Sequence, residues 1–225
     1  MSELNASIRN IPMPPRMSRR PISRKGFPVP YFVTVKDENG DYDFRAIESG
    51  PIVNCIKRNL CWLCGDTLGQ FRCFVIGPMC AFNRISAEPP SHRECAEYAV
   101  KACPFLSKPN ARRNEAGLVE KYGAEVTESF VGGHGLKHNP GVTLLWITKH
   151  YKLVADGNGG ILWELGDPIE LYFIKEGRKA TRAEIDASIS IGLPKVRATA
   201  ESEGPEAVIE FEKSVKRGLS LLPAE

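Results

Sequence analysis

Short runs of aliphatic, β-branched and aromatic residues recur along this chain between polar and turn residues, and each run predicts a β-strand. Residues 31–36 and 42–47 are rich in strand formers and flank an Asn39-Gly40 pair. Because Asn-Gly favours the tight turn between paired strands, we expect an N-terminal β-hairpin here. Residues 71–76 predict a further strand, which a Gly-Pro pair ends. The segment 79–85 is expected to be a returning strand or an irregular segment.

The C-terminal third repeats the strand signal. Residues 142–154, 161–165 and 169–174 are rich in aliphatic, β-branched and aromatic residues, with turn residues at 156–160 and 166–168. This order predicts a small antiparallel meander, in which consecutive strands are neighbours.

Apolar residues at helical spacing predict helices in the remaining segments. One short helix is expected to end near Asn59, one to begin at His92, and one to lie around residues 115–122.

Two further helices are expected at the C-terminus. Thr181 and Glu184 form the capping-box pattern that begins a helix, and Gly192 and Pro194 are expected to end it. The last helix is expected to begin at Gly204-Pro205.

Two residue pairs have the spacing of metal ligands. Cys61 and Cys64 form a C-x2-C pair that Gly65 follows, as suits a tight turn, and His92 and Cys95 form an H-x2-C pair. Together they predict a closed tetrahedral site for a structural Zn²⁺ ion, with no position left for water. The alternatives are four ordinary buried residues, or a redox C-x2-C pair, which would be expected to open a helix.

The second ligand pair is expected to lie at the start of a helix. Ser91 and Glu94 form a second capping-box pattern, directly after two prolines. His92 and Cys95 would then share one face of the first turn, where the helix dipole favours a thiolate.

Composition sets the class of protein. The chain has 225 residues, of which 42% are hydrophobic and 25% charged, as in ordinary globular proteins. It has no apolar run near the ~18 residues of a membrane span and no apolar region typical of a secretory signal. Seven cysteines with metal-type spacing favour a reducing, cytoplasmic setting over a disulfide framework.

These elements predict an α+β fold. We expect a treble-clef-like zinc-binding half with an N-terminal β-hairpin, followed by a small antiparallel sheet with two C-terminal helices. The expected organisation is an extended Pro/Arg-rich arm at 1–30, the zinc-binding module at 31–106, a loop or linker at 107–141, and the sheet with its helices at 142–225. Whether the second and fourth segments pack as one domain is left open.

A glycine-rich loop holds a second candidate site. His134 and His138 lie in the segment 131–141, and His150 follows as a candidate third ligand. The glycines and Pro140 predict a loop, so solvent-facing histidines are the plainer interpretation. A nuclease of the HNH type is disfavoured, because residues 66–91 contain no histidine to act as the base.

Positive charge is concentrated at the N-terminus. The chain has a net charge of +3, but residues 1–26 hold six basic residues and one acidic residue, so the remainder is slightly acidic. An arm laid along the protein surface, or a solvated tail, is the favoured interpretation, because no aromatic residues are interleaved with the arginines. The candidate nucleic-acid contacts are Arg16, Arg19, Arg20, Arg24, Lys25, Arg112 and Arg113.

Several short motifs resemble a known group of proteins. They are Cys61-Trp62-Leu63-Cys64-Gly65, Gly77-Pro78-Met79-Cys80, Asn83-Arg84, Glu88-Pro89-Pro90-Ser91-His92, Cys95-Ala96 and Ala102-Cys103-Pro104-Phe105-Leu106. With these motifs the chain resembles uncharacterised bacterial and bacteriophage proteins that carry a treble-clef-like zinc finger. The similarity covers roughly half of the chain, from Ile11 into the finger. It implies a prokaryotic or phage cytosolic setting and the zinc site, and nothing catalytic.

Three hypotheses for function follow. The first is a structural-zinc binding module that contacts nucleic acid or a partner protein, with no catalytic residues and no membrane partner. The second is a hydrolase or nuclease that uses the region from His134 to His150. The third is a phage-encoded protein–protein adaptor or modulator of a host factor.

Overall fold

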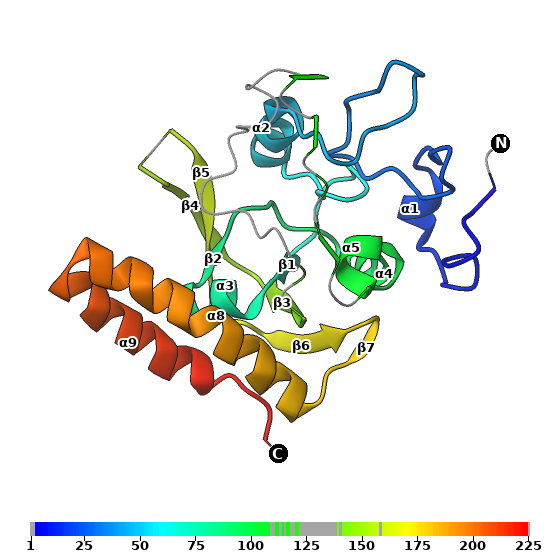
Figure 1. Cartoon of the computed structure of the whole chain (residues 1–225). Coiled ribbons are helices and arrows are strands. Elements are labelled where there is room, and N and C mark those ends of the chain that lie inside the picture. Colours follow the sequence, from blue (N-terminus) through cyan, green and yellow to red (C-terminus); the bar gives the residue numbers. More distant parts are fainter. Residues whose placement is uncertain are drawn as a thin grey trace.

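Two antiparallel sheets form the centre of the molecule (Figure 1). The computed structural model describes residues 3–108, 111–112, 114, 116–117, 120–121, 139, 141–157 and 159–224. One sheet has the strand order β1-β3-β6-β7 and the other β2-β5-β4. The strands are β1 (Arg72–Ile76), β2 (Ile85–Ser86), β3 (Thr143–Thr148), β4 (Tyr151–Ala155), β5 (Ile161–Leu165), β6 (Glu170–Lys175) and β7 (Arg178–Lys179). The predicted α+β class and antiparallel pairing are confirmed.

Helices cover these sheets on several sides. The helices are α1 (Pro15–Ser18), α2 (Ser49–Arg58), α3 (Pro78–Asn83), α4 (Arg93–Ala102), α5 (Pro104–Ser107), α8 (Arg182–Glu203) and α9 (Pro205–Leu219). The helix expected to end near Asn59 is α2, and Asn59 is its C-cap in the left-handed conformation. Half of residues 115–122, and His134 and His138 with most of their loop, lie outside the described residues. No helix within the described ranges is long and apolar enough to cross a membrane.

The C-terminal strands form one long bent hairpin. β3 pairs with β6 and β4 pairs with β5, so the two arms stay together while they pass from one sheet into the other. At the bend the Gly166 amide donates to the His150 carbonyl, and a Cβ on Gly166 would collide with that carbonyl. Glycine therefore permits a close approach of the two arms. The three predicted strand regions are present, but the prediction of a simple meander was wrong.

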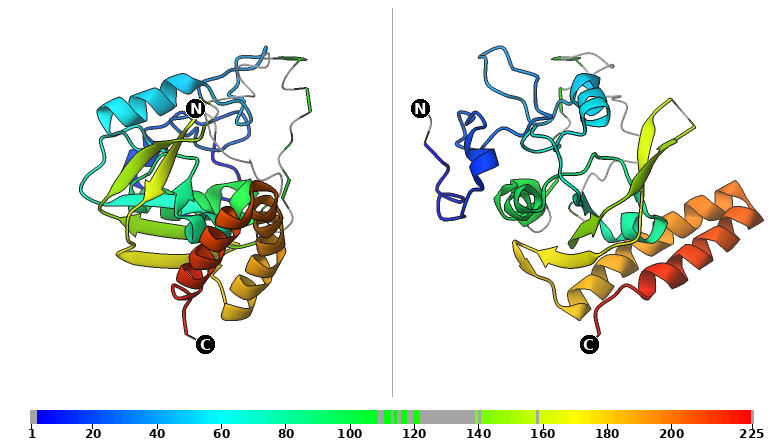
Figure 2. Two further views of the ribbon diagram at one scale, coloured as in Figure 1. Left: turned by 90° about the vertical axis from the view of Figure 1, so that its left-hand side faces the viewer. Right: turned by 180° about the vertical axis from the view of Figure 1, so that it is seen from behind.

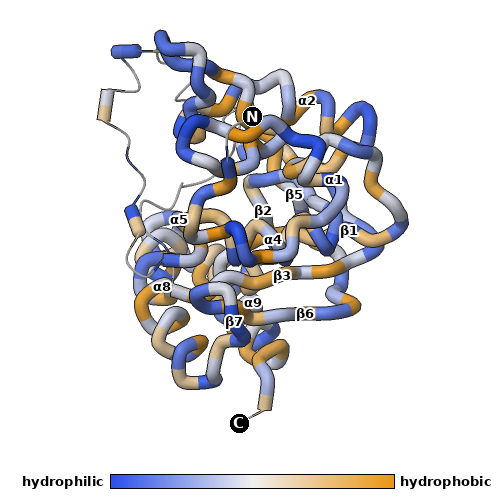
Figure 3. Tube along the Cα trace, turned by 90° about the vertical axis from the view of Figure 1, so that its right-hand side faces the viewer, coloured by the Kyte–Doolittle hydropathy of each residue, from blue (hydrophilic) through white to orange (hydrophobic). Residues whose placement is uncertain are grey.

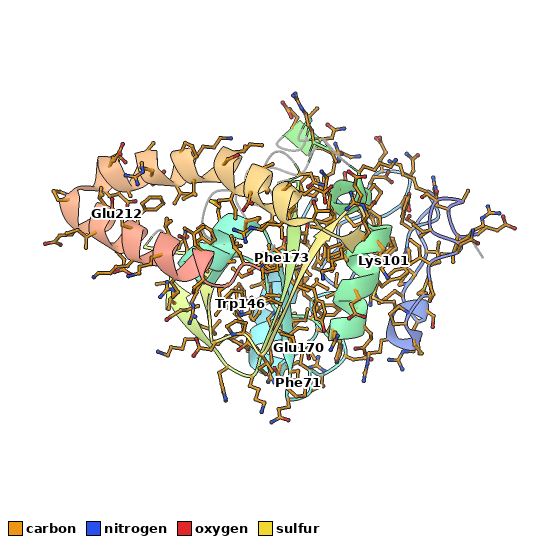
Figure 4. All side chains as sticks on the ribbon, turned by 90° about the horizontal axis from the view of Figure 1, so that it is seen from below. Phe71, Lys101, Trp146, Glu170, Phe173 and Glu212 are labelled. Atoms are coloured by element: carbon orange, nitrogen blue, oxygen red, sulfur yellow. The ribbon has the colours of Figure 1, made fainter. Side chains whose placement is uncertain are left out.

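Both sheets join parts of the chain that are distant in sequence. β1 pairs with β3, placing Phe74 opposite Trp146, and β2 pairs with β5. Every residue of β3 is buried, because α4 covers one face of its sheet and the main hydrophobic core lies on the other. In the view from below, Trp146 and Phe173 lie between the α8–α9 hairpin and α4, on which Lys101 is labelled (Figure 4). Segments 31–106 and 142–225 thus share their sheets.

The segment after β1 is a helix, and the expected strand or irregular segment was wrong. Pro78 begins α3, where its missing N–H costs nothing, and Arg84 ends the helix in a left-handed conformation. Ala81 and Phe82 are buried in the main core. The hairpin-like stretch expected between the ligand pairs is therefore replaced by strand, helix and strand, and these two strands belong to different sheets.

The N-terminal hairpin is reduced to its turn. Residues 31–47 contain one antiparallel bridge, between Lys36 and Tyr42, instead of the two predicted strands. The residues before the turn bind elsewhere, since the Tyr31 amide donates to the Leu63 carbonyl. Contact with a distant segment has overridden the local strand preference.

The two C-terminal helices form a hairpin at the edge of the molecule (Figures 1 and 2). α8 begins with the predicted capping box of Thr181 and Glu184. The prediction that it ends at Gly192 and Pro194 was wrong, because α8 continues to Glu203. Its second half packs against α9, where Ala200 is 7% exposed. This packing outweighs the cost of a proline inside the helix.

The N-terminal segment lies against α4 (Figure 2). It carries hydrophobic and hydrophilic residues in close succession (Figure 3). Ile8 and Met17 are 2% and 3% exposed, and they belong to one apolar cluster with Leu63, Leu68 and Tyr98. Residues 3–30 contain the short helix α1 and several turns rather than a continuous extended arm.

Candidate metal centre

The structure brings the four predicted ligands together. The ligand atoms of Cys61, Cys64, His92 and Cys95 all lie within 4.8 Å of one another. In a tetrahedral site with metal–sulfur distances of about 2.3 Å, the sulfur atoms would be roughly 3.7 Å apart. The four residues can therefore hold a metal ion.

A tight turn, which we call the knuckle (residues 61–66), carries the first pair. The Gly65 amide donates to the Cys61 carbonyl at 2.9 Å, and the Cys61 amide donates to the Asp66 carbonyl at 2.8 Å. Gly65 has a φ of 83°, and a Cβ on it would lie 2.5 Å from the Tyr31 ring. Glycine is thus required both for the left-handed conformation and for the close approach of Tyr31.

The second pair lies at the start of α4, but the predicted capping box is not formed. His92 itself is the N-cap residue, and no side chain caps the helix. Ser91 instead exchanges two backbone hydrogen bonds with Cys73 of β1, of 2.8 and 3.0 Å. The Glu94 carboxylate accepts from Arg16. The sheet, rather than a local cap, therefore sets where α4 begins.

Backbone amides donate hydrogen bonds to the sulfur atoms of the first pair. The Cys61 sulfur accepts from the Cys64 amide at 3.5 Å and from the His92 amide at 3.4 Å, and the Cys64 sulfur accepts from the Asp66 amide at 3.5 Å. Such bonds favour the thiolate, which is the form that binds metals.

The ring of His92 is oriented by a contact outside the ligand set. Its Nε2 lies 3.1 Å from the Thr67 carbonyl, and its Nδ1 lies 3.4 Å from the Cys64 sulfur. A carbonyl can only accept, so Nε2 carries the proton and donates. The neutral ring then presents the lone pair of Nδ1 to a metal, which is the usual role of a partner behind a histidine ligand. No sequence pattern marked Thr67.

The pKa values of His92, Cys61 and Cys95 are shifted by contacts within the cluster. Hydrogen bonds to Cys61 and Cys64 raise the pKa of His92 to about 10, against the opposing effect of burial. Burial raises the pKa of Cys61, but hydrogen bonds from Cys64, Cys95 and His92 outweigh it, and the net shift is downward. Hydrogen bonds to Cys61 and Cys64 raise the pKa of Cys95. A metal ion that binds these ligands must therefore displace the protons of His92 and Cys95.

The centre is closed to solvent. Cys61 and Cys95 are 0% exposed, Cys64 is 6% exposed and His92 is 8% exposed. Apolar residues of the N-terminal segment, the knuckle and α4 form one cluster with the three cysteines. A buried set of four protein ligands matches a structural metal site rather than a catalytic one.

Arginines of the N-terminal segment bind the protein itself. Arg16 donates to Asp66 and Glu94, both at 3.1 Å, and Arg19 also donates to Asp66. Arg20 donates to the carbonyls of Val29 and Pro30. Two of the predicted nucleic-acid contacts therefore converge on the carboxylate that ends the knuckle. Their ion pairs tie the segment to the candidate centre.

The other candidate contacts do not join this group of ion pairs. Arg24 donates to the Asn39 carbonyl, while Lys25 and Arg112 are exposed. Arg113 lies outside the described residues.

Of the three histidines of the second candidate site, only His150 lies among the described residues. His150 is exposed at the bend between β3 and β4, where its carbonyl accepts from Thr148 and Gly166. Across the described part of the chain, Cys61, Cys64, His92 and Cys95 make the only group of three or more His, Cys, Asp or Glu residues placed to hold a metal.

No protein-family model, curated protein or solved structure matches this chain. Its function is therefore inferred from its own residues.

Proposed function

We propose that this chain is a structural-zinc binding module. The observation that carries the proposal is the closed set formed by Cys61, Cys64, His92 and Cys95, whose ligand atoms lie within 4.8 Å of one another. Three thiolates and one imidazole form a soft ligand set that suits Zn²⁺. With Zn²⁺ they carry a net charge of −1, which nearby arginines can balance.

The zinc ion would connect three parts of the chain. Cys61 and Cys64 belong to the knuckle after α2, and His92 and Cys95 belong to α4. Asp66 ends the knuckle and holds the N-terminal segment through its arginines. The ion therefore acts as a structural cross-link, and its binding free energy contributes to folding.

The arrangement supports a variant of the treble clef. A C-x2-C knuckle and a second ligand pair at a helix start are the features that it shares with that motif. The strand–helix–strand segment between the pairs replaces the hairpin. The expected prokaryotic or phage setting stays part of this proposal.

The module would present a binding surface rather than an active site. A small cavity lined by apolar residues of α3, β3 and the C-terminus has a volume of about 10 Å³, room for a single water molecule. Nothing in the described part of the chain favours the hydrolase hypothesis for the region of His150.

Nucleic acid is the first partner to test. Arg19 keeps 65% of its side chain exposed while it pairs with Asp66, so phosphate could compete for it. Binding of a fluorescent DNA or RNA duplex should weaken steeply between about 50 and 200 mM salt if phosphates are contacted. Binding to a protein bait that is insensitive to salt, with none to nucleic acid, would favour the adaptor hypothesis instead.

Metal analysis tests the zinc site directly. Protein purified without added metal should contain about one zinc per chain, as a four-ligand site requires. Cys95→Ser should lose the zinc and its cooperative unfolding transition.

Cys103→Ser is the matched control for this experiment. Cys103 follows the same helix at its other end and takes no part in the cluster, so this variant should keep its zinc. Zinc retained in both Cys61→Ser and Cys95→Ser, or a wild-type chain that folds without metal, would reject the proposal.

A further inference from the structure

One exposed apolar face on α8 is not used by the fold. Ile191 is 68% exposed, the most exposed large hydrophobic side chain among the described residues. Ala183, Ala187, Pro194 and Ala198 are also exposed. With Ile191 they follow one another at spacings of four, four, three and four residues, so they share one side of the helix.

The opposite side of α8 is the one that packs into the protein. Ile185, Ile189 and Ala200 are buried there, against α3 and α9. The helix is therefore apolar on two opposite faces, of which the molecule covers one.

The exposed face is symmetric along the helix. Its midpoint lies between Ser190 and Ile191. About this point Ala187 is the mirror of Pro194, and Ala183 is the mirror of Ala198. Two copies of α8 placed antiparallel across a two-fold axis would therefore bring Ala183 opposite Ala198 and Ala187 opposite Pro194, with the two copies of Ile191 next to the axis.

The charges beside this face are complementary under the same symmetry. Glu184 and Asp186 lie in the first half of α8, and Lys195 and Arg197 lie in the second half. On the helical wheel Glu184 and Lys195 share one flank, and Asp186 and Arg197 share the other. An antiparallel partner would place each basic residue beside an acidic residue of the second copy.

Asp186 and Arg197 remain reachable although they have partners within the chain. Asp186 pairs with Arg182 and is 51% exposed, and Arg197 lies 3.8 Å from Glu212 and is 49% exposed. In Figures 1 and 2 the hairpin lies at the edge of the molecule and its tip extends beyond the sheets. A second hairpin can therefore approach α8.

We propose that the exposed face of α8 is a homodimer interface, in which two copies of the chain pair through antiparallel α8 helices. Ile191 lies near the two-fold axis, and Asp186 and Arg197 form ion pairs between the copies. Residues 183–198 span about 24 Å of helix. One helix pair of this length forms a small interface, so dissociation is expected in the micromolar range.

Sedimentation equilibrium over concentrations from ~1 to ~500 µM tests the proposal. The wild-type weight-average mass should rise from 24.9 kDa towards twice that value. Ile191→Lys places a charge at the axis and should keep the mass at 24.9 kDa at every concentration. Ile209→Lys is the matched control, because Ile209 is 55% exposed on α9 and should not affect the dimer.

A charge exchange tests the orientation of the helices. Asp186→Arg and Arg197→Asp should each weaken self-association at least tenfold, because each places like charges opposite one another. An equal mixture of the two variants should recover the wild-type mass, since both ion pairs form again in the mixed dimer. Circular dichroism of each variant shows whether its helices are intact.

Three results would overturn the proposal. They are a wild-type chain that is monomeric throughout, a dimer that survives Ile191→Lys, and a mixture of the charge variants that stays monomeric. A monomeric wild type whose α8 face becomes protected only when another protein is added would assign the face to that protein instead.

Discussion

Packing of α9 against α3 can be tested with a single methyl group. Gly218 lies in the last turn of α9 beside Phe82, which is 4% exposed in the main core. A Cβ on Gly218 would lie 2.5 Å from both Cγ and Cε1 of Phe82, and closer still to Cδ1. Ordinary carbon–carbon contacts are about 3.5–4.0 Å, so Gly218→Ala requires a shift of about 1 Å or more in the ring or the helix.

The magnitude follows from two opposing effects. Overpacking of a well-filled core costs about 1–3 kcal/mol. Alanine recovers about 0.8–1 kcal/mol, because glycine is the poorer helix former. The adjoining cavity of about 10 Å³ gives the Phe82 ring little room to move. Because the overlap with Phe82 is severe, the overpacking cost should lie in the upper half of its range, so we expect Gly218→Ala to lower the free energy of unfolding by about 1–2 kcal/mol.

Gly69 provides the same substitution without the collision. It is exposed, it is not one of the glycines with positive φ, and a Cβ there would meet no atom within 4 Å beyond its chain neighbours. Gly69→Ala should therefore raise the free energy of unfolding by about 0.4–1 kcal/mol. Urea denaturation followed by tryptophan fluorescence measures both variants, with the midpoint and the slope compared to the wild type.

The two variants are expected to change the free energy of unfolding in opposite directions, and this makes the reasoning refutable. If Gly218→Ala is as stable as the wild type, α9 does not pack on Phe82 as described. A smaller side chain at position 82 should also relieve the collision, so Phe82→Leu should cost less in the Gly218→Ala background than in the wild type. Simple addition of the two effects would count against direct contact.

Two further predictions concern the start of α8. Thr181→Ala removes the capping box and should lower the free energy of unfolding by about 1 kcal/mol, whereas Thr199→Ala, which removes an exposed hydroxyl from the same helix, should change it far less. The pKa of Glu184 is held well below its usual range, first by the side-chain hydrogen bond from Arg178 and then by the Thr181 amide. A lowered pKa stabilises the folded state above the unfolded value of about 4.3, and this stabilisation is lost as the pH falls through the folded value. The free energy of unfolding of Glu184→Gln should therefore fall less than that of the wild type between about pH 5 and pH 2. Urea denaturation at acidic pH measures this difference, and equal losses in the two proteins would contradict the role given to Glu184.

Features that depend on neighbouring residues were predictable from the sequence. The end of α2 at Asn59 depends on one residue that tolerates a left-handed conformation. The start of α8 depends on Thr181 and Glu184, which satisfy each other's backbone amides within one turn. The grouping of Cys61 with Cys64 likewise follows from a spacing that a tight turn imposes.

Features that depend on distant partners were not predictable from the sequence. The local pattern of a strand does not specify its partner strand. β1 pairs with β3, which lies about 70 residues further along the chain, so this pairing depends on how the residues between them fold. The Asn39-Gly40 turn formed, but its strands did not, and the Tyr31 amide donates to the carbonyl of the distant Leu63 instead. Pro194 carried a local signal to end α8, and packing against α9 overrode it.

The candidate metal centre also combines features that neighbouring residues determine with features that distant contacts determine. By itself the sequence determined which four side chains have the spacing and chemistry of metal ligands, because those properties belong to neighbouring residues. Tertiary structure decided that the Thr67 carbonyl orients His92 and that Arg16 joins the N-terminal segment to Asp66. It also decided which face of α8 stays exposed. These contacts join residues far apart in the chain, and only the packing of the whole molecule selects among the many partners that each residue could have met.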